Sequence, residues 1–150
     1  MQLILLQNID RFLNCKIIAV AGASRMEKSF SASAISHLKT KGYTVLSINP
    51  NFAENKGNEF KSVSDLPKAV NNLLVLTNPA QTLSVVKSAI DRGIKNIWVQ
   101  QRSETPEVIA LCSSNKVNLI YNHCIFMFTQ PEGIHKFHYK LKKFFGGIPK

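Results

Sequence analysis

The chain has 150 residues, a formal net charge of +10 and 45% hydrophobic residues. This length fits a single domain spanning residues 1–150, and the ordinary composition excludes a low-complexity chain. The longest apolar runs have the length of strands, which excludes a bilayer-spanning helix. The three cysteines are an odd number without paired spacing, which favours reduced thiols in a cytoplasmic protein.

Apolar runs alternate with amphipathic segments along most of the chain. The runs are rich in β-branched residues and nearly continuous, which predicts parallel strands covered on both faces. We expect five strands, at residues 16–21, 44–48, 73–77, 96–100 and 117–121. Trp98, within the fourth run, is expected in the core. Between the second and third runs we expect only a loop and a short turn at Ser64–Pro67.

The amphipathic segments have the ends expected of helices. Gly42 suits the position just after a helix. Asn78 can cap another helix, and Pro79 fits the first turn of that helix. We expect helices near residues 5–13, 29–41 and 78–92, and a further one beginning near Thr105.

This alternation implies right-handed βαβ crossovers and a parallel sheet. The spacing fits an α/β, Rossmann-like doubly wound sheet of five parallel strands, most simply in the order 3-2-1-4-5. In such a sheet the ligand lies outside the carboxyl ends of the strands, beside the first strand. The candidate ligand loops are therefore those at residues 22–28, 49–56, 77–79, 100–103 and 122–124.

The end of the chain predicts an extra C-terminal amphipathic helix. It opens with a capping-box pattern at Thr129–Glu132 and places apolar residues from Ile134 to Phe145 at helical spacing. We interpret that stripe as packing against the sheet. From residue 133 onward there are five lysines and no acidic side chain. A solvated basic face explains these lysines better than nucleic-acid binding does.

The turn after the first strand, Gly22–Arg25, has the features of a phosphate-binding loop. Its backbone N–H groups and the helix N-terminus that follows can hold a pyrophosphate through donor geometry and the helix dipole. Ser24 adds a hydroxyl donor, while Arg25 and Lys28 add positive charge. The full dinucleotide fingerprint is missing, because Gly22 is the only glycine in the turn. A tight turn without a ligand explains these residues equally well.

The end of the second strand narrows the choice of ligand. A nicotinamide site needs an acidic residue there to accept hydrogen bonds from the adenosine ribose. Here the strand ends Ser47-Ile-Asn-Pro-Asn51, without a carboxylate. Uncharged residues with cations nearby suit a ribose that carries an extra phosphate, as in NADP and coenzyme A. A dehydrogenase normally needs a second region for its substrate, and we expect none here.

Several segments, in this order and spacing, resemble one protein family. They are Val20–Arg25, Gly42–Pro50, Gly57 with Ser64–Pro67, Ile97–Gln101 and Asn122–Met127, and residues His135–Lys150 look like the tail of a bacterial subgroup. Together they resemble the small, single-domain CoA-binding proteins whose fold is shared with the CoA-binding domain of succinyl-CoA synthetase. The resemblance covers nearly the whole chain and implies binding of coenzyme A or an acyl-CoA.

The resemblance also implies a set of cofactor-binding residues. The turn of Gly22, Ala23, Ser24 and Arg25 would hold the CoA phosphates. Asn49 and Pro50 would border the adenosine, Asn78 and Pro79 would form the next wall, and Gln100 would lie towards the pantetheine arm. Lys28 and Lys56 are candidate charge partners. Arg102 departs from the family pattern, which usually has glycine after the paired glutamines, so it could crowd the pantetheine or add a phosphate contact.

One cysteine lies where it could meet the ligand. Cys124 follows the fifth strand and could approach the CoA sulfur, which gives the hypothesis of a mixed disulfide under oxidation. A small buried hydrophobe is the favoured interpretation of Cys124, and Cys15 and Cys112 have the character of structural residues.

The sequence predicts neither catalytic residues nor a metal site. The nine acidic residues are scattered, and nothing resembles a catalytic triad. His135 and His138 lie three apart, which is not a recognised metal-ligand spacing. We therefore expect a CoA-binding module without catalytic machinery or membrane contact, with room for a protein partner or a homodimer. The alternatives are an NADP-dependent or acyl-transfer enzyme component completed by a partner, and nucleic-acid binding through the basic C-terminal helix.

Overall fold

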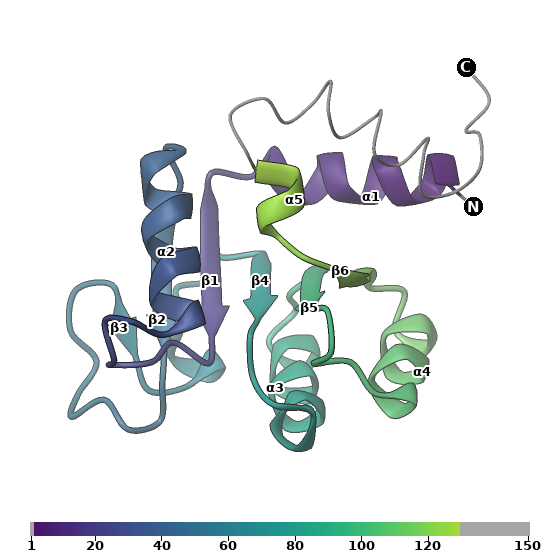
Figure 1. Cartoon of the computed structure of the whole chain (residues 1–150). Coiled ribbons are helices and arrows are strands. Elements are labelled where there is room, and N and C mark those ends of the chain that lie inside the picture. The colour runs from purple at the N-terminus through teal and green to yellow at the C-terminus, as the bar shows by residue number, and fades with distance from the viewer. Residues whose placement is uncertain (1, 130–150) are drawn as a thin grey trace.

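A parallel β-sheet forms the centre of the protein in the computed structural model, which describes residues 2–129 (Figure 1). Its strands are β1 (Ile17–Ala21), β2 (Thr44–Ile48), β3 (Glu59–Phe60), β4 (Asn72–Val75), β5 (Asn96–Gln100) and β6 (Asn118–His123). They lie in the order β3-β2-β1-β4-β5-β6, and every neighbouring pair is parallel. This arrangement confirms the α/β, Rossmann-like fold expected from the sequence.

The predicted count of five strands is one too few. The missed strand is β3, an edge strand of two residues that pairs with Ser47 and Ile48 of β2. It is the third strand along the chain and lies at the edge of the sheet, next to β2. The residues expected as the third strand therefore form β4, beside β1. Two residues contain no apolar run from which periodicity could be recognised, which explains the omission.

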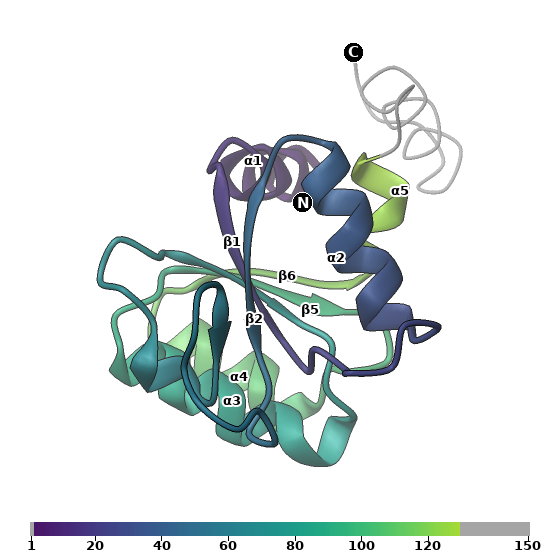
Figure 2. The same ribbon diagram turned by 90° about the vertical axis from the view of Figure 1, so that its left-hand side faces the viewer.

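Helices cover both faces of the sheet. They are α1 (Gln2–Leu13), α2 (Phe30–Thr40), α3 (Pro79–Asp91), α4 (Pro106–Ser114) and the short α5 (Phe126–Thr129), with a 3-10 turn at Val63–Asp65. Figure 2 shows α1, α2 and α5 on one face and α3 and α4 on the other. The predicted C-terminal helix, with its lysines and two histidines, lies outside the described residues.

The helices α2, α3 and α4 begin where the sequence predicts, because a side chain caps the first turn, whereas α1 begins at Gln2, earlier than the predicted start near residue 5. The Ser29 hydroxyl accepts a hydrogen bond from the Ala32 N–H, and the Asn78 amide oxygen accepts one from the Gln81 N–H. Thr105 caps α4 in the same way. Such caps each stabilise a helix by about 1 kcal/mol.

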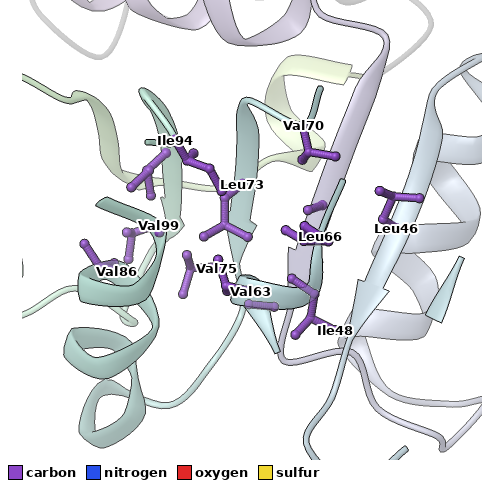
Figure 3. Packing of buried hydrophobic residues seen from close by; sticks show 14 of the residues in the cluster. Leu46, Ile48, Val63, Leu66, Val70, Leu73, Val75, Val86, Ile94 and Val99 are labelled. Atoms are coloured by element: carbon purple, nitrogen blue, oxygen red, sulfur yellow. The ribbon is translucent and has the colours of Figure 1, made fainter. Parts of the chain in front are cut away.

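Alternate side chains of a strand point to opposite faces of the sheet. On β1, Ala19 and Ala21 pack towards α3 and α4, whereas Ile18 and Val20 pack towards α1 and α2. Figure 3 shows part of the first cluster, in which strand residues meet Val86 of α3 and residues of the 3-10 turn. Burial on both faces explains why the strands appear in the sequence as continuous apolar runs.

Trp98 on β5 lies at the centre of the other cluster, which confirms its predicted place in the core. Its side chain is fully buried, and the rings of Phe12 and Phe128 each lie with their centroids 5.4 Å from it in edge-on contact. Its indole N–H donates to the carbonyl oxygen of His123 at 3.0 Å. One residue thus joins α1, β5 and α5.

Asparagines occupy the first position of three neighbouring strands. Asn72, Asn96 and Asn118 are buried and stand side by side in the register of β4, β5 and β6. The Asn72 amide donates to the carbonyl oxygen of Phe12 at 2.6 Å, and the Asn118 amide donates to that of Asn8 at 3.1 Å. These bonds attach α1 to the amino-terminal edge of the sheet.

Candidate functional site

The β1–α2 turn lies at the carboxyl edge of the sheet, and its conformation depends on Gly22. Gly22 has a φ of +88°, and a Cβ atom added to it would lie 2.9 Å from the carbonyl carbon of Leu76. Such a separation is sterically prohibitive against backbone that cannot move aside. The turn therefore needs glycine at this position both for its conformation and for its close approach to the end of β4.

Much of the hydrogen-bonding capacity of this turn is used within the chain. The Ala23 N–H donates to the carbonyl oxygen of Ile48 at 3.1 Å, and the Ser24 N–H donates to the Ser31 hydroxyl at 2.8 Å. The Arg25 N–H has no hydrogen-bond partner among residues 2–129. The sequence predicts a row of free N–H donors from Gly22 to Arg25, but those of Ala23 and Ser24 are engaged.

Asn49 joins the end of β2 to the turn. Its side-chain amide donates to the carbonyl oxygen of Ala23 at 2.7 Å, and its side-chain oxygen accepts from the Asn51 N–H at 2.8 Å. Pro50 beside it is exposed. Asn49 therefore lies next to the turn and its polar atoms hold the loop in shape, while its place beside the adenosine stays a prediction.

Asn78 and Gln100 also use their side chains within the fold. Asn78 caps α3 next to Pro79, and both residues are exposed at the end of β4. Gln100 at the end of β5 is 7% exposed, and its side-chain oxygen accepts from the Ile125 N–H at 3.1 Å. That bond ties the start of α5 to β5.

The remaining predicted residues lie around the same edge of the sheet. Lys28 is exposed before α2, and Lys56 is exposed in a tight loop that its backbone closes with Glu59. Cys124 is half-buried between β6 and α5. Arg102 is exposed in the turn after β5 and has a φ of +74°.

An open groove of about 440 Å³ lies between α2 and the β2–β3 edge. Its lining consists of Ala23, Ser24 and Arg25 of the turn, Ala32, Ile35, Ser36 and Lys39 of α2, and Ser47, Phe52 and Glu59 from β2, the loop after it and β3. Of the twelve predicted site residues, Ala23, Ser24 and Arg25 line this groove.

Sequence reasoning missed the other groove residues. The sequence indicates part of this lining through helical spacing, which places Ala32, Ile35, Ser36 and Lys39 along one side of α2. Glu59 belongs to the strand that was not predicted, so the sequence offered no reason to bring it near Arg25.

Within residues 2–129, the side chains of Tyr43, Cys112 and His123 have clearly shifted pKa values. Burial raises the pKa of the Cys112 thiol to about 11, so this cysteine stays a protonated core residue at neutral pH. Burial also raises the pKa of Tyr43, with a smaller contribution from Cys15, and lowers the pKa of His123. None of these groups lines the groove.

Within residues 2–129, no three histidine, cysteine or carboxylate side chains gather closely enough to hold a metal ion. The same part of the chain has no helix long and apolar enough to span a bilayer.

Comparison with solved structures identifies relatives of this fold. A conserved hypothetical protein from Pyrococcus furiosus is 31% identical, with a TM-score of 0.69 over 74% of this chain and 97% of that one. A protein from Thermus thermophilus is 22% identical, with a TM-score of 0.73 over 90% of this chain and 97% of its own. An acetyl-coenzyme A synthetase from Ca. Korarchaeum cryptofilum is 21% identical, with a TM-score of 0.63 over 76% of this chain and 28% of the synthetase.

The likeness to the last two proteins shows a shared fold alone. The family is established by the match of this sequence to a family model. Residues 16–130 match a family described as the CoA binding domain. That match begins just before β1, includes the Gly22 turn and the groove, and extends to the end of α5. The chain therefore belongs to the CoA binding domain family.

Proposed function

We propose that the protein binds coenzyme A or an acyl-CoA at the carboxyl edge of its sheet, beside the β1–α2 turn. The observation that carries this proposal is the groove of about 440 Å³ that opens next to the turn and is lined by Arg25. Arg25 has no ion-pair partner among residues 2–129, so its guanidinium is available to a phosphate. Membership of the CoA binding domain family supports the same ligand.

The predicted residues take two roles in this proposal. Ser24, Arg25 and Lys28 contact phosphates of the ligand, because their side chains carry donors or positive charge at the surface. Asn49, Asn78 and Gln100 position the loops through the hydrogen bonds described above, with Pro50 and Pro79 beside them. Lys56 stands at the far end of the loop after β2 and contributes through its charge.

We further propose that this module holds its ligand without transforming it. Among the described residues that line the groove, Glu59 is the single carboxylate, and none is a histidine or a cysteine. Proton transfer and nucleophilic attack usually need two such groups within hydrogen-bond reach of each other. Any chemistry on a bound acyl-CoA would then come from a partner protein.

A panel of ligands tests the proposal. Thermal unfolding is followed in the presence of CoA, acetyl-CoA, dephospho-CoA, NAD, NADP and an oligonucleotide. CoA or acetyl-CoA is expected to raise the Tm by binding the folded state, with dephospho-CoA less effective. The absence of a shift with every CoA compound would overturn the proposal. A shift with NADP alone would favour the dehydrogenase alternative, and a salt-sensitive shift with the oligonucleotide alone would favour nucleic-acid binding.

A further inference from the structure

A row of lysines follows the amino-terminal edge of the sheet. Because all neighbouring strands are parallel, the residues that precede them lie at one edge. In Figure 1 the arrows of β1 and β4 point away from α1, so this edge is the one beside α1. Each of the five longer strands has a lysine one to four residues before its start, and these residues form the lysine row: Lys41 before β2, Lys16 before β1, Lys68 before β4, Lys95 before β5 and Lys116 before β6.

Backbone hydrogen bonds attach the row to the sheet. The carbonyl oxygen of Lys16 accepts from the Thr44 N–H at 2.8 Å, and that of Lys95 accepts from the Asn118 N–H at 2.8 Å. The Lys95 N–H donates to the side-chain oxygen of Asn71 at 2.8 Å. Neighbouring strands are ~4.8 Å apart, so these bonds place the lysines in close succession along the edge.

The ammonium groups of the lysine row have no carboxylate partners. Lys41 is half-buried and the other four are exposed, and none forms an ion pair within residues 2–129. Cations near the C-terminus of a helix stabilise that helix. Lys16, Lys68 and Lys95 stand outside the last turn of any described helix, so this role does not account for them. Their charges remain available to an anionic partner.

The positive charge is concentrated at this edge of the sheet. Two carboxylates, Asp10 and Asp91, are balanced in number there by Arg11 and Arg92. The C-terminal ends of α2, α3 and α4 add about half a negative charge each, which five lysines exceed. Around the carboxyl edge, five cations accompany five carboxylates: Arg25, Lys28, Lys56, Lys61 and Arg102 with Glu27, Glu54, Glu59, Glu104 and Glu107.

We propose that the lysine row binds the phosphate backbone of double-stranded DNA without reading its sequence. Ammonium groups that neutralise phosphates release the condensed counterions of the duplex, and this release supplies most of the affinity of such contacts. The row lies at the edge of the sheet opposite the β1–α2 turn. The inference therefore goes beyond the proposed function and does not depend on it.

The side chains around the row favour a duplex over other anionic partners. Protein interfaces have an apolar centre, and membrane-surface sites insert apolar side chains. Among the first residues of the five strands, Ile17 is the one large apolar side chain that is exposed, at 36%. Proteins that bind single strands or RNA loops stack bases on aromatic rings. Tyr43 is engaged instead, because its hydroxyl donates to the carbonyl oxygen of Leu13 at 2.6 Å and the Lys16 ammonium lies 5.6 Å from its ring centroid.

The salt dependence of DNA binding tests the lysine row. Fluorescence anisotropy with a labelled duplex of mixed sequence gives the association constant at a series of salt concentrations. Its logarithm is expected to fall linearly with the logarithm of salt concentration, by about 0.9 per phosphate contacted. The double variant Lys95→Gln/Lys116→Gln removes two contacts, so its slope is expected to be shallower by about 1.8. The matched control Lys61→Gln/Arg102→Gln removes the same charge from the carboxyl edge and is expected to keep the wild-type slope.

Four results would overturn the proposed surface. They are the absence of duplex binding by the wild-type protein at low salt, an equal change of slope in the two double variants, an unchanged slope in both, and tighter binding of an RNA duplex of the same sequence. An equal change would reflect net charge alone, and an unchanged slope would place the contacts elsewhere on the chain. Thermal unfolding with CoA tests the proposed function separately, so failure of one proposal leaves the other standing.

Discussion

The buried asparagines at the amino-terminal edge of the sheet differ in their role from the exposed cations that line the groove beside α2. At the amino-terminal edge, Asn72, Asn96 and Asn118 are buried, and their amides contact α1 or one another. Arg25, in the turn at the carboxyl edge, and Lys39, in the C-terminal half of α2, line an open groove and have no ion-pair partners within the described part of the chain. The amide groups of the three asparagines are thus used by the fold, although the side-chain oxygens of Asn72 and Asn118 have no partner within the described residues, whereas the charges of the groove remain available to a ligand.

This difference predicts where a substitution changes stability and where it changes binding. A buried polar group is cut off from water, so losing its partner costs free energy of folding. An exposed cation on a concave surface contributes little to folding, but it contributes to the affinity for an anion. Some residues of the carboxyl edge also serve the fold: Asn49 and Gln100 bond within the chain, and Gly22 lets two backbone segments approach.

The largest expected effect is that of Gly22→Ala. The alanine has to adopt a φ of +88° and place its Cβ 2.9 Å from a backbone carbon of Leu76. We expect the free energy of unfolding to fall by about 2–4 kcal/mol, measured by urea denaturation. Gly93→Ala is the matched control, since Gly93 has the same φ of +88° and no atom within 4 Å of an added Cβ. It is expected to lose only about 1 kcal/mol. Equal losses in the two variants would show that the close approach to β4 contributes nothing.

Asn72→Ala tests the amino-terminal edge. It removes the bond from the Asn72 amide to Phe12 and leaves a small void in the core. We expect a loss of about 1–3 kcal/mol in the free energy of unfolding and an unchanged affinity for CoA. The control is Asn14→Ala, an exposed asparagine whose side chain makes no hydrogen bond within residues 2–129. A weakened CoA affinity in Asn72→Ala would contradict the division between the two edges.

Arg25→Gln is the reciprocal test at the carboxyl edge. It removes one positive charge from the groove, and we expect the affinity for CoA to fall about tenfold. The free energy of unfolding is expected to change by less than about 0.5 kcal/mol, because the exposed side chain has no partner to lose. Arg11→Gln, on α1, controls for the change in net charge. A loss of stability in Arg25→Gln as large as that in Asn72→Ala would contradict the expected difference between the two residues.

The fold could be predicted from the sequence because its determinants are local. Continuous apolar runs mark strands buried on both faces, and the caps Ser29, Asn78 and Thr105 stand where the structure has them. The strand β3 was missed because two residues have no periodicity, and its place in the sheet depends on pairing with β2.

The groove could be predicted only in part, because it depends on contacts between distant segments. Ala23, Ser24 and Arg25 follow from a strand that ends in a tight turn before a helix. The sequence could not show that the side chains of Asn49 and Gln100 already have partners inside the chain. Lys39 and Glu59 come from a helix face and an unpredicted strand, and only the tertiary arrangement brings them to one groove.

The smallest expected effect is that of Arg102→Gly, a substitution in the turn after β5 at the carboxyl edge of the sheet. Arg102 has a φ of +74°, in a turn closed by the bond from the Ser103 N–H to the carbonyl oxygen of Gln100. Glycine adopts that conformation without steric cost, so we expect stability to rise by up to about 1 kcal/mol. Lys116→Gly is the control, because Lys116 has a φ of +55° after α4, remote from the ligand loops.

The affinity of Arg102→Gly for CoA decides whether Arg102 takes part in binding. The side chain is exposed and does not line the groove, so the dissociation constant is expected to stay within about twofold of the wild type. Tighter binding would mean that the arginine crowds the pantetheine arm, and weaker binding would mean that it contacts a phosphate. An unchanged affinity together with a higher Tm would mean that this departure from glycine affects the backbone alone, and that the charges available to the ligand are concentrated at the groove beside α2.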